Sequence, residues 1–208
     1  MSVVKAAVIS EVSASARNAD VVLALEKAGA TVLNVGMTSP EDKVELTYIH
    51  TGFMAGLLIN AEVCDMVIGG CGTGQGFLNS VVQYPSVICG LILEPVDAWL
   101  FSQINSGNCV SLALNKGYGW AAELNLQNIF EKLFKDPMGG GFPVHRSASQ
   151  AESRSLLKQI SGCSHRGMEE IIPKMPKDVL KRVEACAPFI EVLGSSLKGA
   201  AYVDALRA

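Results

Sequence analysis

Short apolar runs alternate with segments of helical periodicity over the first two thirds of the chain. The apolar runs predict five buried strands, at residues 3–9, 31–35, 66–70, 87–93 and 108–114. The intervening segments predict helices at 17–27 and 46–60, from residue 77 onward, at 97–104 and at 120–134. Strands that lack polar alternation are covered on both faces of a sheet. The pattern therefore predicts an α/β fold, a three-layer sandwich around a five-stranded, doubly wound parallel sheet.

A glycine-rich break separates this pattern from the rest of the chain. Residues 136–143 read DPMGGGFP, and such a run is typical of a mobile connection. Only helical pieces are predicted beyond it, at 147–160, 179–183 and 189–197. We therefore divide the chain into an α/β domain at residues 1–135 and a C-terminal helical arm at 136–208. The arm carries apolar residues that a finished domain does not need, which predicts at least a homodimer with the arm in or near the interface: Phe189, Ile190, Val192, Leu193 and Leu197.

Composition narrows the classes of partner. The 208 residues carry a net charge of −3 and no basic stripe, so nucleic acid is not expected as a partner. The apolar runs are far shorter than the roughly 20 residues of a membrane span, and the first residues show no signal-peptide pattern. The six cysteines form no CxxC pair and most lie among aliphatic residues. Free buried thiols suit a reducing compartment, so we expect a cytoplasmic protein that acts on a small molecule.

The stretch VIGGCGTGQGFLNS, residues 67–80, carries the clearest chemical signal. Five of the eight positions from Gly69 to Gly76 are glycine, which lets the backbone adopt positive φ and approach a ligand closely. Free N–H groups where a helix begins bind anions, and a thiol beside them is favoured as a thiolate. We therefore interpret Cys71 as a candidate base and residues 72–76 as a cradle for negative charge. The alternative is a strand–helix turn whose glycines only permit close packing.

Other ligand-binding and catalytic motifs are incomplete in this sequence or absent from it. A dinucleotide fingerprint needs a third glycine where Phe77 stands, although Glu94 lies at a plausible ribose-binding distance and keeps a nucleotide-binding protein open. A P-loop lysine and a GxSxG nucleophile elbow are absent from the sequence. Cys163 and His165 are isolated, so no metal site is predicted. His50 lies on a predicted helix and is interpreted as structural.

Three blocks of the sequence are informative when taken together: LTYIHTGFMAG from residue 46, DMVIGGCGTGQG from residue 65 and INSGN from residue 104. They resemble the RpiB/LacA/LacB family, that is, ribose-5-phosphate isomerase B and the galactose-6-phosphate isomerase subunits. The resemblance covers residues 3–135. It implies a five-stranded parallel sheet, a dimer whose sites are shared between subunits, and interconversion of aldose and ketose phosphates without a redox cofactor or metal.

The resemblance also implies roles for particular residues. Cys71 matches the cysteine that moves a proton between C1 and C2, and Thr73 and the other residues of 72–76 match the anion hole for the enediolate oxygen. Arg146 and Arg154 are loose counterparts of the phosphate-binding arginines, and Arg17 is a third candidate for this role. The expected substrate-binding set is Ser10, Arg17, Gly72, Gly74, Gln75, Gly76, Phe77, Asn105, Arg146 and Arg154.

Two departures from the family pattern bear on the substrate. The Asp-His pair after the first strand is replaced by Ser10-Glu11-Val12-Ser13, and Ile104 stands where the ring-opening histidine precedes Asn105. A substrate that is already open-chain, such as a tetrulose phosphate or a keto-uronate, needs no such histidine. The sequence therefore predicts an aldose–ketose isomerase of a pentose, hexose or tetrose, free or phosphorylated, working through an enediolate with Cys71 as base. The alternative is a non-catalytic, regulatory sugar-phosphate binder on the same fold.

Overall fold

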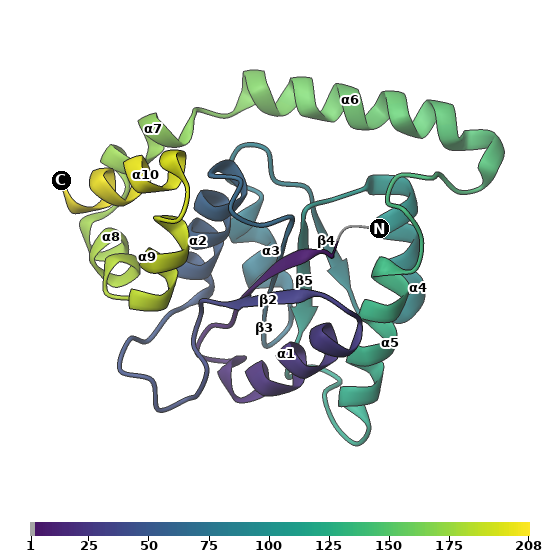
Figure 1. The fold of residues 1–208 in the computed structure, drawn as a ribbon, viewed down its shortest axis with the longest axis horizontal. Helices are drawn as coiled ribbons and strands as arrows, with labels where there is room; N and C mark the ends of the chain where they lie inside the picture. The colour runs from purple at the N-terminus through teal and green to yellow at the C-terminus, as the bar shows by residue number, and fades with distance from the viewer. Residues whose placement is uncertain (1–2) are drawn as a thin grey trace.

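Five parallel strands form the middle layer of the computed structural model, which describes residues 3–208 (Figure 1). They are β1 (Lys5–Ile9), β2 (Thr31–Asn34), β3 (Met66–Cys71), β4 (Cys89–Ile92) and β5 (Cys109–Ala113). Their order across the sheet is β2-β1-β3-β5-β4. The predicted fold class and all five predicted strands are confirmed, and four of the strands are shorter than the apolar runs that predicted them.

The strand order creates a topological switch point at the carboxyl edge of the sheet, beside the loops that follow β1, β3 and β5. From β1 the chain crosses to β2 on one side, whereas β3 pairs with β1 on the other side. The register aligns Ile9 with Gly69, and Cys71 with Ala113, so the carboxyl ends of β1, β3 and β5 lie together. In doubly wound sheets, ligands bind in the crevice outside such a switch point.

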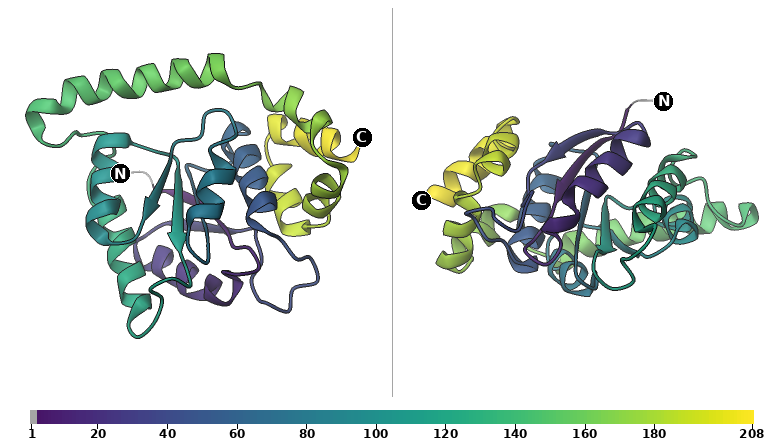
Figure 2. Two further views of the ribbon diagram at one scale, coloured as in Figure 1. Left: turned by 180° about the vertical axis from the view of Figure 1, so that it is seen from behind. Right: turned by 90° about the horizontal axis from the view of Figure 1, so that it is seen from below.

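Helices cover both faces of the sheet (Figure 2). On one face α1 (Asn18–Lys27), α4 (Pro95–Leu100) and α5 (Ala122–Phe134) bury Leu25, Ala98 and Phe130 in a common core. On the other face α2 (Tyr48–Asn60) and α3 (Gln75–Val81) bury Phe53 and Phe77. A 3-10 turn, Ser15–Arg17, precedes α1. The predicted helices are therefore present, with ends shifted by a few residues.

The predicted helix at 97–104 has a distinct beginning and end. Glu94 is the N-cap residue of α4, and its side chain and that of Asp97 form a reciprocal capping box. After Leu100 the helix widens into a π-turn over Phe101–Asn105. The Glu94 carboxylate accepts a hydrogen bond from the backbone of the first turn of α4. A dinucleotide site would instead need this carboxylate to bind the ribose hydroxyl groups.

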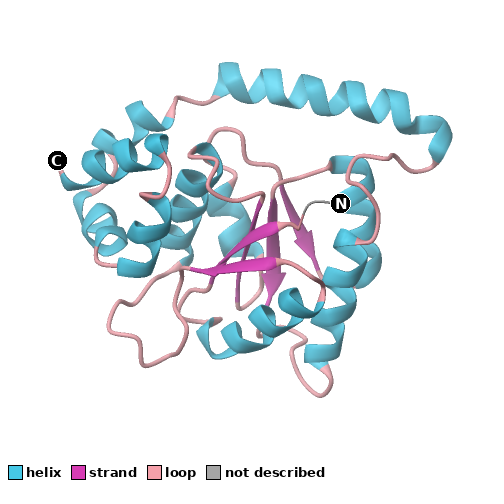
Figure 3. Cartoon of the chain, viewed as in Figure 1, coloured by secondary structure: helices cyan, strands magenta, loops and turns pink. Residues whose placement is uncertain are grey.

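The C-terminal third contains one exposed helix and one packed group of helices (Figure 3). The 3-10 turn Val144–Arg146 leads into α6 (Ser147–Ser164), which has no buried residue. This long helix runs along one side of the molecule, from the α4 end to the packed C-terminal helices (Figure 3). The packed group comprises α7 (Met168–Ile171), the 3-10 turn Ile172–Lys174, α8 (Lys177–Glu184), α9 (Ala187–Leu193) and α10 (Leu197–Arg207). These elements bury Met168, Phe189 and Tyr202 in the same core as Phe53 of α2.

This packing corrects the expectation for the apolar residues of the tail. Phe189 and Leu193 are fully buried within the chain, and Ile190 and Val192 are partly buried against the same core. Among the five, only Leu197 stays 96% exposed. The predicted helix at 189–197 is also wrong in extent, because α9 ends at Leu193 and Ser196 caps the separate helix α10. These residues therefore give no argument for a partner chain.

No helix within residues 3–208 has both the length and the apolar character that crossing a bilayer requires.

Candidate active site

Cys71 lies where β3 ends and the glycine-rich turn begins. Its side chain is 6% exposed, and its carbonyl accepts the Leu114 N–H at 3.0 Å, which fixes the end of the strand. The Sγ atom lies 3.9 Å from the Oγ1 atom of Thr73. The thiol is therefore held at the carboxyl edge of the sheet beside a hydroxyl group and the loop amides.

The glycines around Cys71 serve different purposes. A Cβ on Gly69 would lie 2.2 Å from the ring of Phe77, and one on Gly70 would lie 2.4 Å from the Leu112 carbonyl. These two glycines permit close packing, as the simpler interpretation holds. Gly74 instead has φ +77°, a left-handed conformation that turns the chain into α3. A Cβ on Gly72 would lie no closer than 3.5 Å to any other atom, so neither lack of space nor backbone strain requires glycine at this position.

The loop offers a set of free backbone donors. The N–H groups of Thr73, Gly74 and Gly76 donate no hydrogen bond to any residue between 3 and 208. Gln75 N–H donates to Thr73 Oγ1 at 3.3 Å, and Gly72 N–H donates to Ser13 Oγ at 2.9 Å. Successive free amides in such a turn form an anion-binding concavity. The anion cradle therefore has fewer free donors than the sequence predicted, because the Gly72 N–H already donates to Ser13.

Two other expected contacts are made elsewhere. The ring of Phe77 is fully buried against Gly69, so only its backbone faces the turn. Ser10 is also buried, and its Oγ accepts a hydrogen bond from Asn18 Nδ2 at 3.0 Å. The side-chain amides of Asn18 and Asn34 donate a hydrogen bond to each other beside it. Both side chains stabilise the walls of the crevice.

The turn after β1 brings a carboxyl group to the crevice. Glu11 is 2% exposed, and Ser13 Oγ donates a hydrogen bond to its Oε1. Burial raises the pKa of Glu11 above its ordinary value, and the hydrogen bond from Ser13 offsets this only in part. Because Ser13 Oγ also accepts the Gly72 N–H, Glu11 is linked through one hydroxyl to the loop after Cys71.

The loop after β5 closes the crevice from the other side. Asn115 Nδ2 donates to the Ser13 carbonyl at 2.6 Å, and the Asn115 and Lys116 amides donate to the Gly72 carbonyl at 3.1 and 2.8 Å. Further along, Tyr118 donates to Asp20 Oδ2 at 2.6 Å. The Arg17 guanidinium lies 4.6 Å from the Tyr118 ring centre. Arg17 therefore stacks within a wall of the crevice.

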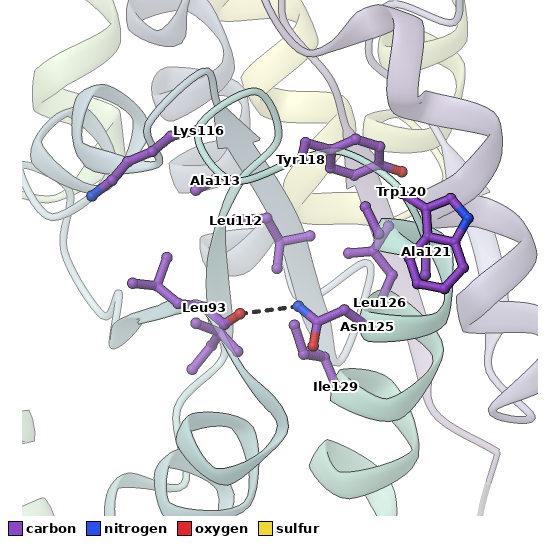
Figure 4. Close-up of a pocket in the computed structure, with 13 residues that line it drawn as sticks. Leu93, Leu112, Ala113, Lys116, Tyr118, Trp120, Ala121, Asn125, Leu126 and Ile129 are labelled. Carbon is purple, nitrogen blue, oxygen red and sulfur yellow. Dashed lines mark hydrogen bonds between the residues drawn. The ribbon is translucent and has the colours of Figure 1, made fainter.

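A cavity of about 460 Å³ lies behind this loop, on the α5 side of the sheet (Figure 4). Leu93, Leu112 and Leu126 form its apolar floor, and Trp120 stands fully exposed at its rim. Cys71 belongs to the core on the opposite face of the sheet. None of the site residues predicted from the sequence lines this cavity.

The structure places three of the predicted site residues away from Cys71. Arg154 of α6 donates to the carbonyls of Ile104 at 2.9 Å and Gly139 at 3.1 Å. With Asn105 it lines a cavity of about 770 Å³ at the amino ends of β4 and β5. The five residues of β5 separate this end from the Cys71 end by about 17 Å. Arg146 lies in the turn before α6, where its Nε donates to Ser149 at 3.2 Å.

Some residues at the crevice were not singled out from the sequence as site residues. Glu11 and Asn115 are each the second residue after a buried strand, and a polar residue at that place is a detectable signal. Tyr48 begins α2 and its ring packs on Gly76, which no local pattern indicates. His50 has the structural role expected of it, since its side chain completes the capping box of α2 with Thr47.

A buried thiol and free amides lie at the switch point of a doubly wound parallel sheet, which is where α/β proteins of this architecture bind ligands. Comparison with known proteins gives the family. The model described as Ribose/Galactose Isomerase matches residues 6–141, and the chain belongs to this family. Comparison with curated protein sequences gave no match.

Two solved structures resemble the chain over nearly its whole length. A ribose-5-phosphate isomerase LacAB_rpiB from Vibrio parahaemolyticus is 40% identical, with a TM-score of 0.93 over 99% of this chain and 100% of that one. A 4-deoxy-L-threo-5-hexosulose-uronate ketol-isomerase, complexed with a tartrate, is 35% identical, with a TM-score of 0.93 over 98% and 99%. Family and neighbours together support a sugar isomerase.

A third structure shares the fold over a smaller part. A ribose 5-phosphate isomerase from Thermotoga maritima is 24% identical and covers 72% of this chain, while 98% of that chain is matched, with a TM-score of 0.58. The two neighbours that match nearly the whole chain therefore cover a part of it that this shorter protein does not.

Proposed function

We propose that the protein is an aldose–ketose isomerase that works through an enediolate with Cys71 as its base. The observation that carries the proposal is the Cys71 thiol, followed directly by the free N–H groups of Thr73, Gly74 and Gly76. Isomerisation needs a base at carbon and preorganised donors where the oxyanion develops. The thiol and the free amides lie together where β3 ends, and this supports the proposal.

The proposed steps follow from this arrangement. The Cys71 thiolate removes the proton from the carbon next to the carbonyl group, and the electron pair moves onto the carbonyl oxygen. The free loop amides stabilise the enediolate oxygen that results. The thiol returns the proton to the former carbonyl carbon, while the hydroxyl proton passes to the other oxygen. The net change is an exchange of carbonyl and hydroxyl positions.

We further propose an open-chain sugar acid of the keto-uronate class as the substrate. Ile104 stands where the family carries a ring-opening histidine, and an open-chain substrate has no ring to open. A neighbour 35% identical over 98% of this chain is named as a ketol-isomerase of such a uronate. The competing substrate is ribose 5-phosphate, since the neighbour from Vibrio parahaemolyticus is named as a ribose-5-phosphate isomerase.

The acid group of the substrate needs a second binding site. Asn105 and Arg154 are separated from Cys71 of their own chain by the length of β5, and Arg146 lies in the turn before α6, the helix that carries Arg154. We propose that a second copy brings them to its neighbour's crevice, as the family resemblance implies. An arginine fork is suited to this role because it donates two parallel hydrogen bonds to a carboxylate or phosphate.

Deuterium incorporation from heavy water, followed by NMR, tests the proposal. The native protein is expected to label the carbon next to the carbonyl of an open-chain keto-uronate faster than that of ribose 5-phosphate. Cys71→Ala should lower this rate by about 10²–10⁴-fold, the usual contribution of a positioned base. Cys163→Ala, at an exposed thiol of α6, is the matched control and should leave the rate unchanged. Binding of both ligands without label from either would instead identify a non-catalytic binder.

A further inference from the structure

Glu11 is a buried carboxyl group without a cation. Its side chain is almost fully enclosed after β1, and among residues 3–208 the recorded ion pair joins Arg207 to Glu184 at the surface. Glutamate is rarely buried unless paired, since taking its charge out of water is unfavourable. A carboxyl group kept in this state beside a ligand crevice is a candidate for a functional role.

The partner of Glu11 defines what it can do. Ser13 Oγ donates its single hydrogen to Glu11 Oε1. Ser13 Oγ in turn accepts a hydrogen bond from the Gly72 N–H at 2.9 Å. A carboxylate can only accept hydrogen bonds. As long as Glu11 is ionised, the Ser13 hydrogen therefore points to Glu11, and a lone pair of Ser13 stays available for Gly72.

The Gly72 peptide unit is consequently held from both sides. Its N–H donates to Ser13, and its carbonyl accepts from the amides of Asn115 and Lys116. Gly72 has no positive φ and no close steric neighbour that would fix its orientation. Hydrogen bonds, rather than packing or backbone strain, thus set the direction in which the chain leaves Cys71 toward the free amides of Thr73 and Gly74.

We propose that Glu11 is a positioning residue that acts through Ser13 and Gly72 to hold the anion cradle in shape. It accepts the Ser13 hydroxyl hydrogen and thereby keeps the free N–H groups of Thr73, Gly74 and Gly76 directed into the crevice. Glu11 needs no contact with the substrate for this. The inference rests on the proposed function for its catalytic consequence, whereas the link from Glu11 to Gly72 is a property of the protein without substrate.

Amide hydrogen exchange measured by NMR on the substrate-free protein tests that link. Glu11→Met removes the acceptor with little change in side-chain length, and Ser13→Ala removes the hydroxyl. Each is expected to speed exchange of the Gly72 N–H by about tenfold or more. The Leu114 N–H, which bonds to Cys71, should stay unchanged and shows that the strand end is intact. Ser13→Thr retains a hydroxyl and should restore slow exchange at Gly72.

Kinetics test the consequence. Glu11→Met and Ser13→Ala should each lower kcat by about 10- to 100-fold with KM within about twofold, because the cradle acts on the oxyanion of the transition state. The kcat of the double variant should be no lower than that of the less active single variant, because both substitutions break the same chain of hydrogen bonds. Ser15→Ala removes another buried hydroxyl of the same turn, bonded only to the Val12 carbonyl, and should leave kcat unchanged.

Two results would overturn the inference: unchanged Gly72 exchange in Glu11→Met, or losses in kcat that multiply in the double variant. If Glu11→Met does not fold, Ser13→Ala and its threonine counterpart decide the same question. If the native protein isomerises neither sugar, the proposed function has failed, and the exchange experiment alone still decides whether Glu11 holds Gly72.

Discussion

At the scale of single residues, the crevice contains one group that is unfavourable on its own and one that suits its position. Within residues 3–208, Glu11 is buried without a cation, whereas Gly74 has a left-handed backbone that glycine, which has no Cβ, adopts without strain. The two residues affect stability for different physical reasons, so each is tested by its own substitution.

The pH dependence of stability follows from the raised pKa of Glu11. Folding holds the proton on Glu11 more tightly than the unfolded chain does, so the free energy of unfolding falls as pH rises from the ordinary value of 4.5 until folded Glu11 is fully ionised. Glu11→Gln cannot ionise. Its melting temperature should therefore exceed that of the native protein by a margin that appears above pH 4.5 and then levels off. A constant margin at all pH values would contradict the burial argument.

Gly72 and Gly74 form a matched pair for a stability test. An alanine at Gly74 would adopt a left-handed backbone and place its Cβ 2.5 Å from the Leu91 side chain, so Gly74→Ala should lose about 1–2 kcal/mol or more. Gly72→Ala would place its Cβ in ordinary van der Waals contact with Asn115 and Ser13, at 3.5 Å, and should change stability by less than about 0.5 kcal/mol. Urea unfolding of the two variants measures the difference, and equal losses would show that this view of the turn is wrong.

At the scale of elements, α6 is held differently from the other helices. It buries no residue, and its recorded bonds to the rest of the fold are few. Arg154 reaches the carbonyls of Ile104 and Gly139, and Ser161 accepts the Ser86 N–H at 3.0 Å. Leu156, Leu157 and Ile160 stay about half exposed. Such a helix has low local stability, since few apolar contacts oppose its opening.

Removal of the Arg154 contacts should loosen α6 without unfolding the sheet. Arg154→Ala is expected to speed proteolytic cleavage within residues 136–164 about tenfold, while the melting temperature of the core changes little. Arg146→Ala is the control, because within residues 3–208 the Arg146 side chain bonds only to nearby Ser149. Similar cleavage rates for both variants would mean that α6 is fixed by something other than Arg154.

At the scale of the whole molecule, the predicted binding residues fall into two groups at opposite ends of the sheet. Cys71 and its loop lie at the carboxyl ends of the strands, whereas Asn105 and Arg154 lie near the amino ends of β4 and β5. A two-fold dimer repeats each contact twice and can place the second group of each copy at the first group of the other. This is how we expect one complete site to form from two chains.

Mixing of inactive variants tests the shared site. Cys71→Ala and Arg154→Ala homodimers should each be nearly inactive. After unfolding and refolding together, half of the dimers are mixed and carry one intact site, so activity should return to about a quarter of the native value. Sedimentation or light scattering should show a dimer in each sample. A monomer, or a mixture that stays inactive, would contradict the proposal.

The sequence alone determined the main features of the fold and the place of the thiol. Apolar runs fixed which segments become buried strands, because removal of apolar side chains from water is a property of each segment. The glycine-rich turn after a buried strand placed Cys71 at the carboxyl edge. Both inferences depend on residues close together in the chain.

Only the tertiary structure decided which surfaces meet. The apolar residues of α9 were available for a partner chain as far as the sequence could show, but α2 of the same chain covers Phe189. Likewise, the bonds of Ser13 to Gly72 and of Asn115 to Ser13 join segments that are 59 and 102 residues apart. Contacts of this kind depend on how the whole chain closes around its core, and local patterns of polarity do not encode that closure.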